Sequence, residues 1–191
     1  MRIAVFCGAS SGRRPVYRDV AFAFGRLLAE RGIGLVYGGG HVGLMGAVAD
    51  GALEAGGEVI GVMPRALAER EIAHRGLTRL DVVPSMHVRK QRMAELAGGF
   101  VTLPGGAGTF EEIFEQWTWA QLGIHEKPCG FLNIDGYFDP LMAMVDAVTR
   151  EGFMKPVYRQ MLVVTPDPDE MIRRFATYTP PPRKWTEAPA P

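Results

Sequence analysis

Positions 104–112 read Pro104-Gly105-Gly106-Ala107-Gly108-Thr109-Phe110-Glu111-Glu112. The apolar run at 99–103 that precedes them predicts a buried parallel strand. A helix is predicted after them from apolar residues that share one helical face, Phe110, Ile113, Phe114 and Trp117. A glycine-rich turn between a strand and a helix lets a ligand approach the backbone, and the first free N–H groups of the helix attract an anion. The stretch therefore predicts a phosphate site, with Glu112 close enough to reach a sugar joined to that phosphate.

The same residues also have a purely structural interpretation. Thr109 and Glu112 have the spacing of a capping box, in which Thr109 caps the helix and Glu112 reaches back to the Thr109 N–H. Such a box needs no ligand, but it also needs none of the three glycines in the turn. The phosphate site and the capping box both remain open on the sequence alone.

Outward from this stretch, short apolar runs alternate with helical patterns. Strands are predicted at 3–7, 33–37, 58–63, 80–83, 99–103, 129–133 and 162–164. Helices are predicted at 17–28, 44–55, 86–97, 109–122, 138–150 and 168–178. This alternation predicts a doubly wound parallel sheet with helices on both faces, a single-domain Rossmann-like α/β fold. The domain is expected to span 1–178, followed by a proline-rich tail at 179–191.

Three of the predicted strands end in turns of glycine or small hydroxyl residues, at 8–12, 38–43 and 104–109. In an open parallel sheet all three turns lie at the carboxyl edge, so we expect a ligand of nucleotide size there. The middle turn also matches the dinucleotide pattern G-x-G-x-x-G, but the strand after it ends at 62–64 without the acid that holds a ribose. NAD binding is therefore disfavoured, and this turn is interpreted as a close-packing or phosphate-adjacent loop.

The composition is that of an ordinary globular protein. Of the 191 residues, 47% are apolar and 22% are charged, and 21 basic residues balance 21 acidic ones. No overall positive charge is present to hold nucleic acid, and no segment is long enough to span a membrane. Cys7 and Cys129 are expected to be buried hydrophobes, and the apolar run at the N-terminus is too short for a secretory signal, so we expect a cytoplasmic protein. The four histidines lack the spacing of metal ligands, so no metal site is predicted.

Two cations, Arg89 and Lys90, lie near the start of the helix predicted at 86–97. Positive charge there opposes the helix dipole, which hints at an anionic partner, although a solvated surface pair is the simpler interpretation. Lys90 also has the residue type for a Schiff base with pyridoxal phosphate, but no other signature supports that cofactor. Thr118 follows on the same helix as Glu111 and is a candidate to line the cleft further out.

The chain resembles the LONELY GUY family of cytokinin-activating phosphoribohydrolases, whose members are often labelled lysine decarboxylases. Residues 104–112 resemble the family signature P-G-G-x-G-T-x-x-E, and residues 85–90 resemble its segment S-M-H-x-R-K. The turns at 5–11 and 37–46 and the stretch at 71–78 are also similar to the family, and the resemblance extends to about Val164. Ala107 departs from the tyrosine that many members carry, which leaves the pocket wall smaller at this position.

The resemblance implies hydrolysis of the N-glycosidic bond of a nucleoside 5′-monophosphate to a free base and ribose 5-phosphate. It implies Arg89 and Glu112 as catalytic residues, and no metal or other cofactor. Glycosidic cleavage passes through a cationic sugar, which a carboxylate stabilises, and an arginine fork holds phosphate or hydroxyl groups. Together with the phosphate site, the resemblance implies substrate contacts at Glu71, Arg89, Lys90, Gly105, Gly106, Ala107, Gly108, Thr109, Phe110, Glu111, Glu112 and Thr118.

The resemblance also implies a homodimer whose partner helps to enclose the site, with Trp117, Trp119 and the methionines as candidates for an apolar interface. The alternative to an enzyme is a protein that carries a nucleotide or a molybdenum cofactor without turnover. Glu112 and Arg89 favour an enzyme, since a pure phosphate binder would avoid an acid near the anion. The sequence leaves open whether the substrate is a prenylated adenine nucleotide or AMP.

Overall fold

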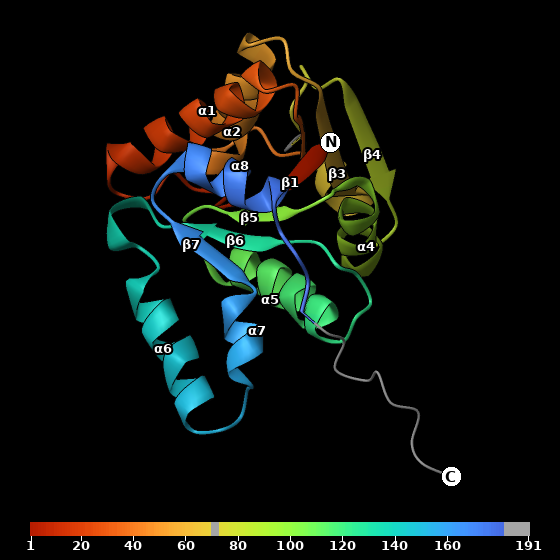
Figure 1. Cartoon of the computed structure of the whole chain (residues 1–191). Coiled ribbons are helices and arrows are strands. Elements are labelled where there is room, and N and C mark those ends of the chain that lie inside the picture. Colours follow the sequence, from red (N-terminus) through yellow and green to blue (C-terminus); the bar gives the residue numbers. More distant parts are fainter. Residues whose placement is uncertain (70–72, 182–191) are drawn as a thin grey trace.

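The computed structural model describes residues 1–69 and 73–181. In these residues seven strands form one sheet, which Figure 1 shows with its helices. The strands are β1 (Arg2–Phe6), β2 (Gly34–Tyr37), β3 (Val59–Pro64), β4 (Arg79–Val83), β5 (Phe100–Thr102), β6 (Cys129–Leu132) and β7 (Leu162–Thr165). The helices are α1 (Pro15–Glu30), α2 (Gly43–Glu54), α3 (Arg65–Ala68), α4 (Met86–Leu96), α5 (Ala107–Gln121), α6 (Asp139–Arg150), α7 (Pro156–Gln160) and α8 (Pro168–Ala176), with a 3₁₀ turn η1 (Ile134–Gly136).

The strand order is β4-β3-β2-β1-β5-β6-β7, and each neighbouring pair is parallel. The chain first builds outward from β1 to β4, then crosses back to β5 and builds outward to β7. In the register, Ala4 of β1 lies between Val36 of β2 and Phe100 of β5. The order of the strands therefore reverses between β1 and β5, which is where open α/β sheets bind ligands. The predicted doubly wound parallel sheet is confirmed.

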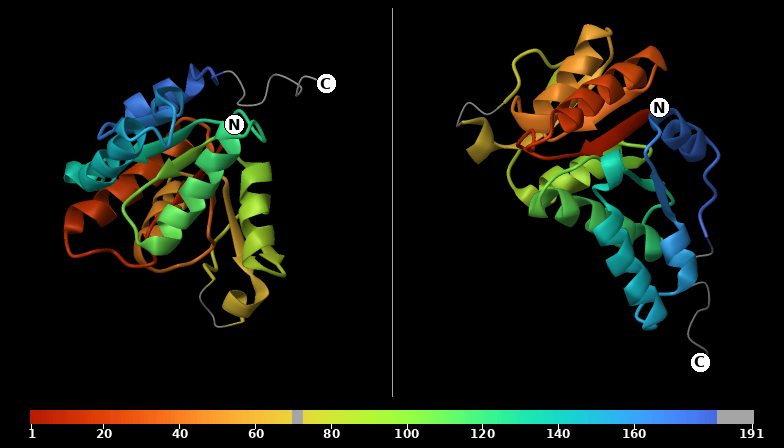
Figure 2. Two further views of the ribbon diagram at one scale, coloured as in Figure 1. Left: turned by 90° about the horizontal axis from the view of Figure 1, so that it is seen from below. Right: turned by 90° about the vertical axis from the view of Figure 1, so that its left-hand side faces the viewer.

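Helices cover both faces of the sheet, as Figures 1 and 2 show from three directions. Helices α1, α2 and α8 pack on one face, and α4, α5, α6 and α7 pack on the other. Successive side chains of β1 point to opposite faces, so that Ile3 and Val5 join the first core while Ala4 and Phe6 join the second. This double burial explains why the strands are continuous apolar runs in the sequence.

The structure differs from the predicted elements in two respects. The short helices α3 and α7 lie where the sequence pattern predicts none, and the second of them begins at Pro156, whose fixed φ suits a first helical turn. Helix α5 begins at Ala107 and not at Thr109, because Gly106 takes an extended conformation and is itself the N-cap. The helix that is expected to bind the phosphate therefore starts closer to β5 than the sequence suggests.

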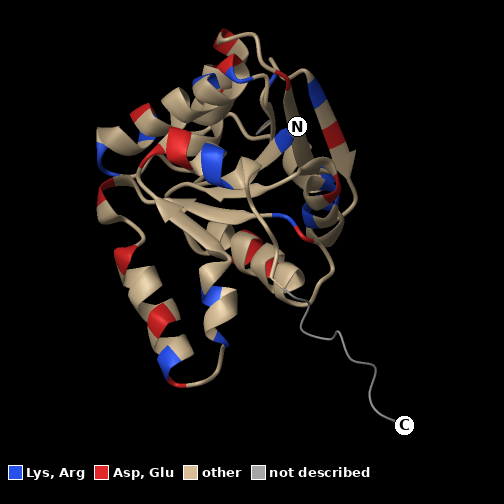
Figure 3. Cartoon of the chain, in the orientation of Figure 1, with Lys and Arg blue, Asp and Glu red and all other residues tan. Residues whose placement is uncertain are grey.

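The surface carries charges of both signs, and Figure 3 shows acidic and basic residues interspersed over the helices. Of the helices within residues 1–69 and 73–181, none has the length and apolar character that a bilayer crossing requires. Of the predicted tail, only residues 179–181 are described. The division into a domain at 1–178 and a tail stays a prediction.

Candidate active site

The turns that follow β1, β2 and β5 meet at the carboxyl edge of the sheet. The N–H of Gly8 donates to the Pro104 carbonyl at 3.0 Å, and the Gly8 carbonyl accepts from the N–H of Leu44 at 3.0 Å. Hydrogen bonds thus join the first turn to the other two, and a cleft of about 530 Å³ opens between them. Its lining consists of Cys7, Gly8, Ala9, Ser10, Gly38, Gly40, Met45, Met63, Leu67, Met86, Arg89, Gly106, Gly108, Thr109, Glu111 and Glu112.

An ion pair between two helices forms the charged centre of the cleft. Arg89 lies near the start of α4 and Glu112 lies in α5, and Nη1 of Arg89 is 3.0 Å from Oε1 of Glu112. The two side chains are only 10% and 11% exposed. Nε of Arg89 also donates to the carbonyl of Val62 at 3.0 Å, which fixes the guanidinium against β3. The two residues expected to be catalytic therefore meet inside the cleft.

The carboxyl of Glu112 has a shifted pKa. Burial raises its pKa above the ordinary value, and the positive charge of Arg89 opposes this shift in part. The neighbouring carboxyl of Glu111 adds to the increase, whereas the ammonium of Lys90 works against it. A buried carboxylate held in one position by an arginine is preorganised to stabilise a positive charge that develops next to it.

Lys90 follows Arg89 in the sequence but has different partners. Its Nζ bonds to the carboxylate of Glu111 and lies 3.0 Å from Oε1 of Glu115. Burial lowers the pKa of Lys90, but the hydrogen bonds and charges of the two carboxylates outweigh burial, and the pKa is raised overall. The anionic partners that Arg89 and Lys90 suggest in the sequence are thus supplied by α5 itself. Lys90 therefore joins α4 to α5 through ion pairs, and it does not line the cleft.

The capping-box interpretation of Thr109 and Glu112 is wrong. Gly106 is the N-cap of α5, so that both residues lie inside the helix. Both are buried, and the carboxylate of Glu112 is paired with Arg89. Glu112 therefore takes no part in capping the helix.

The three glycines around the start of α5 are needed for different reasons. A Cβ at Gly105 would lie 2.1 Å from Oγ1 of Thr109 and 2.9 Å from the N of Gly8, so packing inside the protein excludes a side chain. A Cβ at Gly106 or Gly108 would meet no atom within 4 Å, and neither residue has a positive φ. Both residues are exposed and line the cleft. Their missing side chains leave the first N–H groups of α5 open to a ligand.

Four further residues of the predicted site do not line the cleft. Phe110 packs edge-on against Phe138, Thr118 and Ala107 are exposed on α5, and none of these three lines the cleft. Gly105 lines a smaller hollow of about 240 Å³ beside the cleft. Glu71 lies outside the described residues. Within residues 1–69 and 73–181, no cluster of three or more His, Cys, Asp or Glu side chains is arranged to hold a metal ion.

One wall of the cleft is apolar, which sequence reasoning missed. It is formed by Met45, Met63, Leu67 and Met86. Met63 is buried at the end of β3, whereas Met86 is 43% exposed at the start of α4. The methionines look like core fillers in the sequence. The only signal for a site is that Met63 ends a parallel strand, at the edge where ligands bind.

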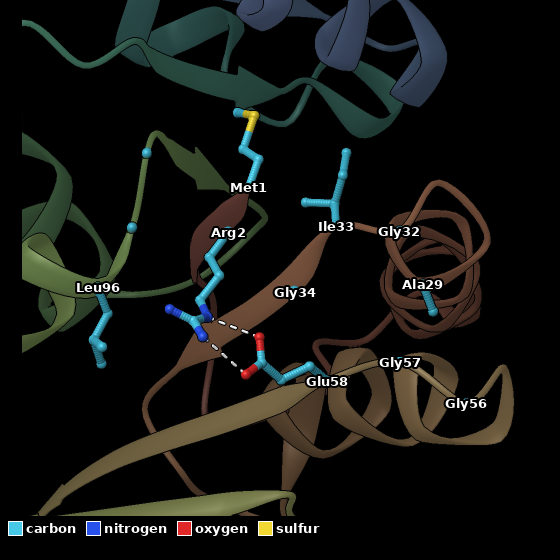
Figure 4. A pocket seen from close by; sticks show the side chains of 12 residues that line it. Met1, Arg2, Ala29, Gly32, Ile33, Gly34, Gly56, Gly57, Glu58 and Leu96 are labelled. Carbon is cyan, nitrogen blue, oxygen red and sulfur yellow. Dashed lines mark hydrogen bonds and ion pairs between the residues drawn. The ribbon is translucent and has the colours of Figure 1, made fainter.

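A second hollow, of about 620 Å³, lies at the opposite edge of the sheet, where the strands begin (Figure 4). Nε and Nη2 of Arg2 donate to the two carboxylate oxygens of Glu58 at 2.7 and 2.9 Å. The hydrogen bond from Arg2 lowers the pKa of Glu58, so the pair is charged and neutralises itself. None of the described residues of the predicted site lies here. The described residues that are expected to do the chemistry therefore lie away from this hollow, and the ion pair of Arg89 and Glu112 lies at the carboxyl edge.

Comparison with known proteins gives three results. Residues 45–175 match a family model described as possible lysine decarboxylase. A probable cytokinin riboside 5′-monophosphate phosphoribohydrolase of Oryza sativa subsp. japonica is 49% identical over 178 residues, which cover 93% of this chain and 80% of that protein. A cytokinin riboside 5′-monophosphate phosphoribohydrolase of Arabidopsis thaliana is 48% identical, with coverage of 94% and 82%.

A solved structure is also similar to this chain. The molybdenum cofactor carrier protein of Chlamydomonas reinhardtii aligns with a TM-score of 0.71 over 93% of this chain and 98% of that one. The two sequences are only 19% identical, so this likeness concerns the fold alone.

Proposed function

Because this chain belongs to the family of cytokinin riboside 5′-monophosphate phosphoribohydrolases, we propose that it hydrolyses the N-glycosidic bond of an N6-modified adenosine 5′-monophosphate. The products are the free base, a cytokinin, and ribose 5-phosphate. The structural observation that carries the proposal is the buried ion pair of Arg89 and Glu112 inside a cleft of nucleotide size.

Glu112 acts at the sugar. As the bond to the base breaks, the ribose becomes an oxocarbenium-like cation. The carboxylate of Glu112 stabilises that positive charge and orients the water that attacks the anomeric carbon. Arg89 keeps the carboxylate in place through Nη1, and its Nη2 holds a hydroxyl or phosphate oxygen of the substrate.

The 5′-phosphate binds at the start of α5. Gly106 and Gly108 have no side chain that would cover the first N–H groups of the helix, and the helix dipole favours an anion there. The base then extends toward the apolar wall formed by Met63, Met86 and their neighbours. Methionine side chains adapt their shape readily, which suits a base with an apolar N6 substituent.

The state of Lys90 argues against the decarboxylase description. A lysine that forms a Schiff base with pyridoxal phosphate needs a lowered pKa so that its amine is free to react. The pKa of Lys90 is raised, and its ammonium group donates hydrogen bonds to the carboxylates of Glu111 and Glu115. The purified protein should accordingly be colourless, and lysine should not be decarboxylated in the presence of pyridoxal phosphate.

The carrier alternative is less well supported. The molybdenum cofactor carrier of known structure is 19% identical to this chain, whereas the phosphoribohydrolases are 48% and 49% identical. The buried carboxylate of Glu112 has a role in cleaving the bond to the sugar, whereas it has none in holding a cargo by its phosphate.

A homodimer in which the second copy covers the cleft is part of the proposal. Val82, Met86 and Val88 lie on β4 and α4 near the cleft and are 44%, 43% and 38% exposed. Trp117 cannot contribute to the interface as the sequence suggests, because it is 4% exposed and its indole N–H donates to the Tyr158 carbonyl at 3.0 Å. A monomer that is fully active at nanomolar concentration, by sedimentation and assay together, would contradict the dimer. The cytoplasmic location stays a prediction from the sequence.

The test of the function is release of free base. The protein is incubated with N6-isopentenyladenosine 5′-monophosphate, with AMP and with N6-isopentenyladenosine, and the products are separated by chromatography. Base should be released from the prenylated monophosphate, whereas the nucleoside, which lacks the phosphate, should be a poor substrate. The rate with AMP measures how much the N6 substituent contributes. Equal turnover of nucleoside and nucleotide would contradict the phosphate site, and no base from any substrate would overturn the function.

A further inference from the structure

Gly38 lies directly after β2, is buried and forms part of the cleft. A Cβ at this position would lie 2.1 Å from Nη2 of Arg89, and 3.0 Å from Sδ of Met45. Gly38 is not among the glycines with positive φ, so the backbone conformation here is open to other residues. The glycine is therefore required for space, and the space is filled by the guanidinium of Arg89.

The guanidinium is held on three sides. Nε donates to the carbonyl of Val62 on β3, and Nη1 is paired with Glu112 on α5. Nη2 rests where the side chain of residue 38 would be, and it has no acceptor in residues 1–69 and 73–181. This nitrogen is a donor left over for an oxygen of the substrate, and its position depends on the absent side chain of Gly38.

We propose that Gly38 is a positioning residue that sets where the Arg89 guanidinium lies, and thereby holds both Glu112 and the free Nη2 in the productive arrangement. This inference rests on the proposed function, in which Arg89 and Glu112 act on the nucleotide. A methyl group at position 38 displaces the guanidinium, which then gives up its bond to Val62 or its contact with Glu112.

The main test is the variant Gly38→Ala. A displacement of about 1 Å in a catalytic arrangement is enough to cost about 10²-fold in rate. We expect kcat for base release to fall by about 10²-fold, with a smaller rise in KM, because Nη2 of Arg89 and Met45 shift while the phosphate site at the start of α5 keeps its N–H groups. The matched control is Gly57→Ala at the opposite edge of the sheet, where a Cβ would lie 2.6 Å from Cβ of Ala29. That variant has a comparable clash without an arginine, and it should keep the wild-type kcat.

A double-mutant cycle shows whether Gly38 acts through Arg89. Lysine at position 89 lacks the Nη2 atom, so the added methyl group has room in an Arg89→Lys background. There, Gly38→Ala should lower the remaining kcat by less than about twofold. An equal loss in both backgrounds, or a wild-type kcat in Gly38→Ala, would overturn the proposal.

Melting temperatures of the same four proteins test the clash without any assay. Gly38→Ala should lower the melting temperature in the wild-type background and much less in the Arg89→Lys background. This comparison holds even if Gly38→Ala folds poorly, and equal losses would overturn the proposal. A wild-type protein that releases no base contradicts the proposed function instead, and the melting cycle then still decides whether Gly38 sets the place of Arg89.

Discussion

Nη1 of Arg89 lies 3.0 Å from Oε1 of Glu112, although the two residues come from helices that follow different strands. In the free protein this contact keeps a buried carboxylate and a buried guanidinium paired. In the proposed reaction Nη1 keeps this contact while an oxygen of the substrate binds the free Nη2 of Arg89. The carboxylate, held in this way, stabilises the positive charge that develops on the sugar.

The first prediction concerns the charge of Glu112. Glu112→Gln keeps the shape and an acceptor for Arg89 but removes the negative charge, so kcat should fall by about 10²–10³-fold. Arg89 loses its counter-charge, and the free energy of unfolding should fall by about 1–3 kcal/mol. The measurement is base release and a melting curve on the same preparation, assayed well below the melting temperature.

Glu95→Gln is the control for that variant, because Glu95 is an exposed acid of α4 that does not line the cleft. It should have wild-type kcat and stability. Native-like turnover in Glu112→Gln would leave the catalytic assignment without its main residue.

The second prediction is the pH dependence of the rate. Glu112 acts as a carboxylate, and burial raises its pKa above the ordinary value of 4.5. Activity should therefore be lost as the pH falls, with an apparent pKa above 4.5. The substrate phosphate also titrates, near pH 6, so two acid limbs are expected in the profile of kcat/KM. The residual activity of Glu112→Gln should retain the phosphate limb and lack the other. A profile with both limbs in the variant would count against Glu112 as the titrating group.

The third prediction separates the two kinds of glycine around the start of α5. Gly108 lies in a helical turn with open space around it, so Gly108→Ala should stabilise the protein by about 0.4–1 kcal/mol. The same methyl group enters the phosphate site, and KM should rise by about tenfold, equivalent to about 1.4 kcal/mol of binding. A variant that is more stable and binds the nucleotide as tightly as wild type would place the phosphate elsewhere.

Gly105→Ala is the counterpart, since its Cβ collides with Thr109 and Gly8. It should lower the melting temperature.

The fourth prediction concerns stability in acid. His125 is partly buried, and burial and the nearby Lys127 lower its pKa from 6.5 to about 4. The unfolded chain binds a proton below pH 6.5 while the folded protein does not, so stability should fall progressively as the pH drops from 6.5 to about 4. His125→Asn keeps an acceptor for the Lys127 N–H but cannot titrate. Its stability should change less over this range, as measured by urea unfolding at several pH values, and an unchanged slope would refute the prediction.

The fold was predictable because parallel topology follows from the alternation of apolar runs and helical patterns. Once the strands are parallel, the turns at 8–12, 38–43 and 104–109 must share one edge, and the structure confirms that they do. Helix α3, in the irregular stretch at 64–79, could not be predicted, because four residues are too few to show the helical spacing of apolar residues.

The details of the site were less predictable, because they depend on packing between elements. Thr109 ranks with the better N-cap residues. The N-cap is nevertheless Gly106, whose backbone is extended, so that α5 begins at Ala107 and both Thr109 and Glu112 lie within the helix and are buried. Which carboxylates of α5 pair with Arg89 and which with Lys90 depends on how α4 packs against α5. A local sequence pattern cannot predict that packing. The burial of Trp117 could have been predicted from the sequence, since Trp117 shares a helical face with Ile113.

The hollow with the Arg2–Glu58 pair has a practical consequence for handling the enzyme. Met1 is 62% exposed beside it, at the edge where β1 begins, and the five residues of β1 separate it from the cleft by about 16 Å. A linker that immobilises the protein through Met1 would lead away from the substrate entrance of its own chain. Attachment through the turn at 8–12 would instead obstruct that entrance, so the amino edge is the better anchor for a surface-bound reactor or sensor.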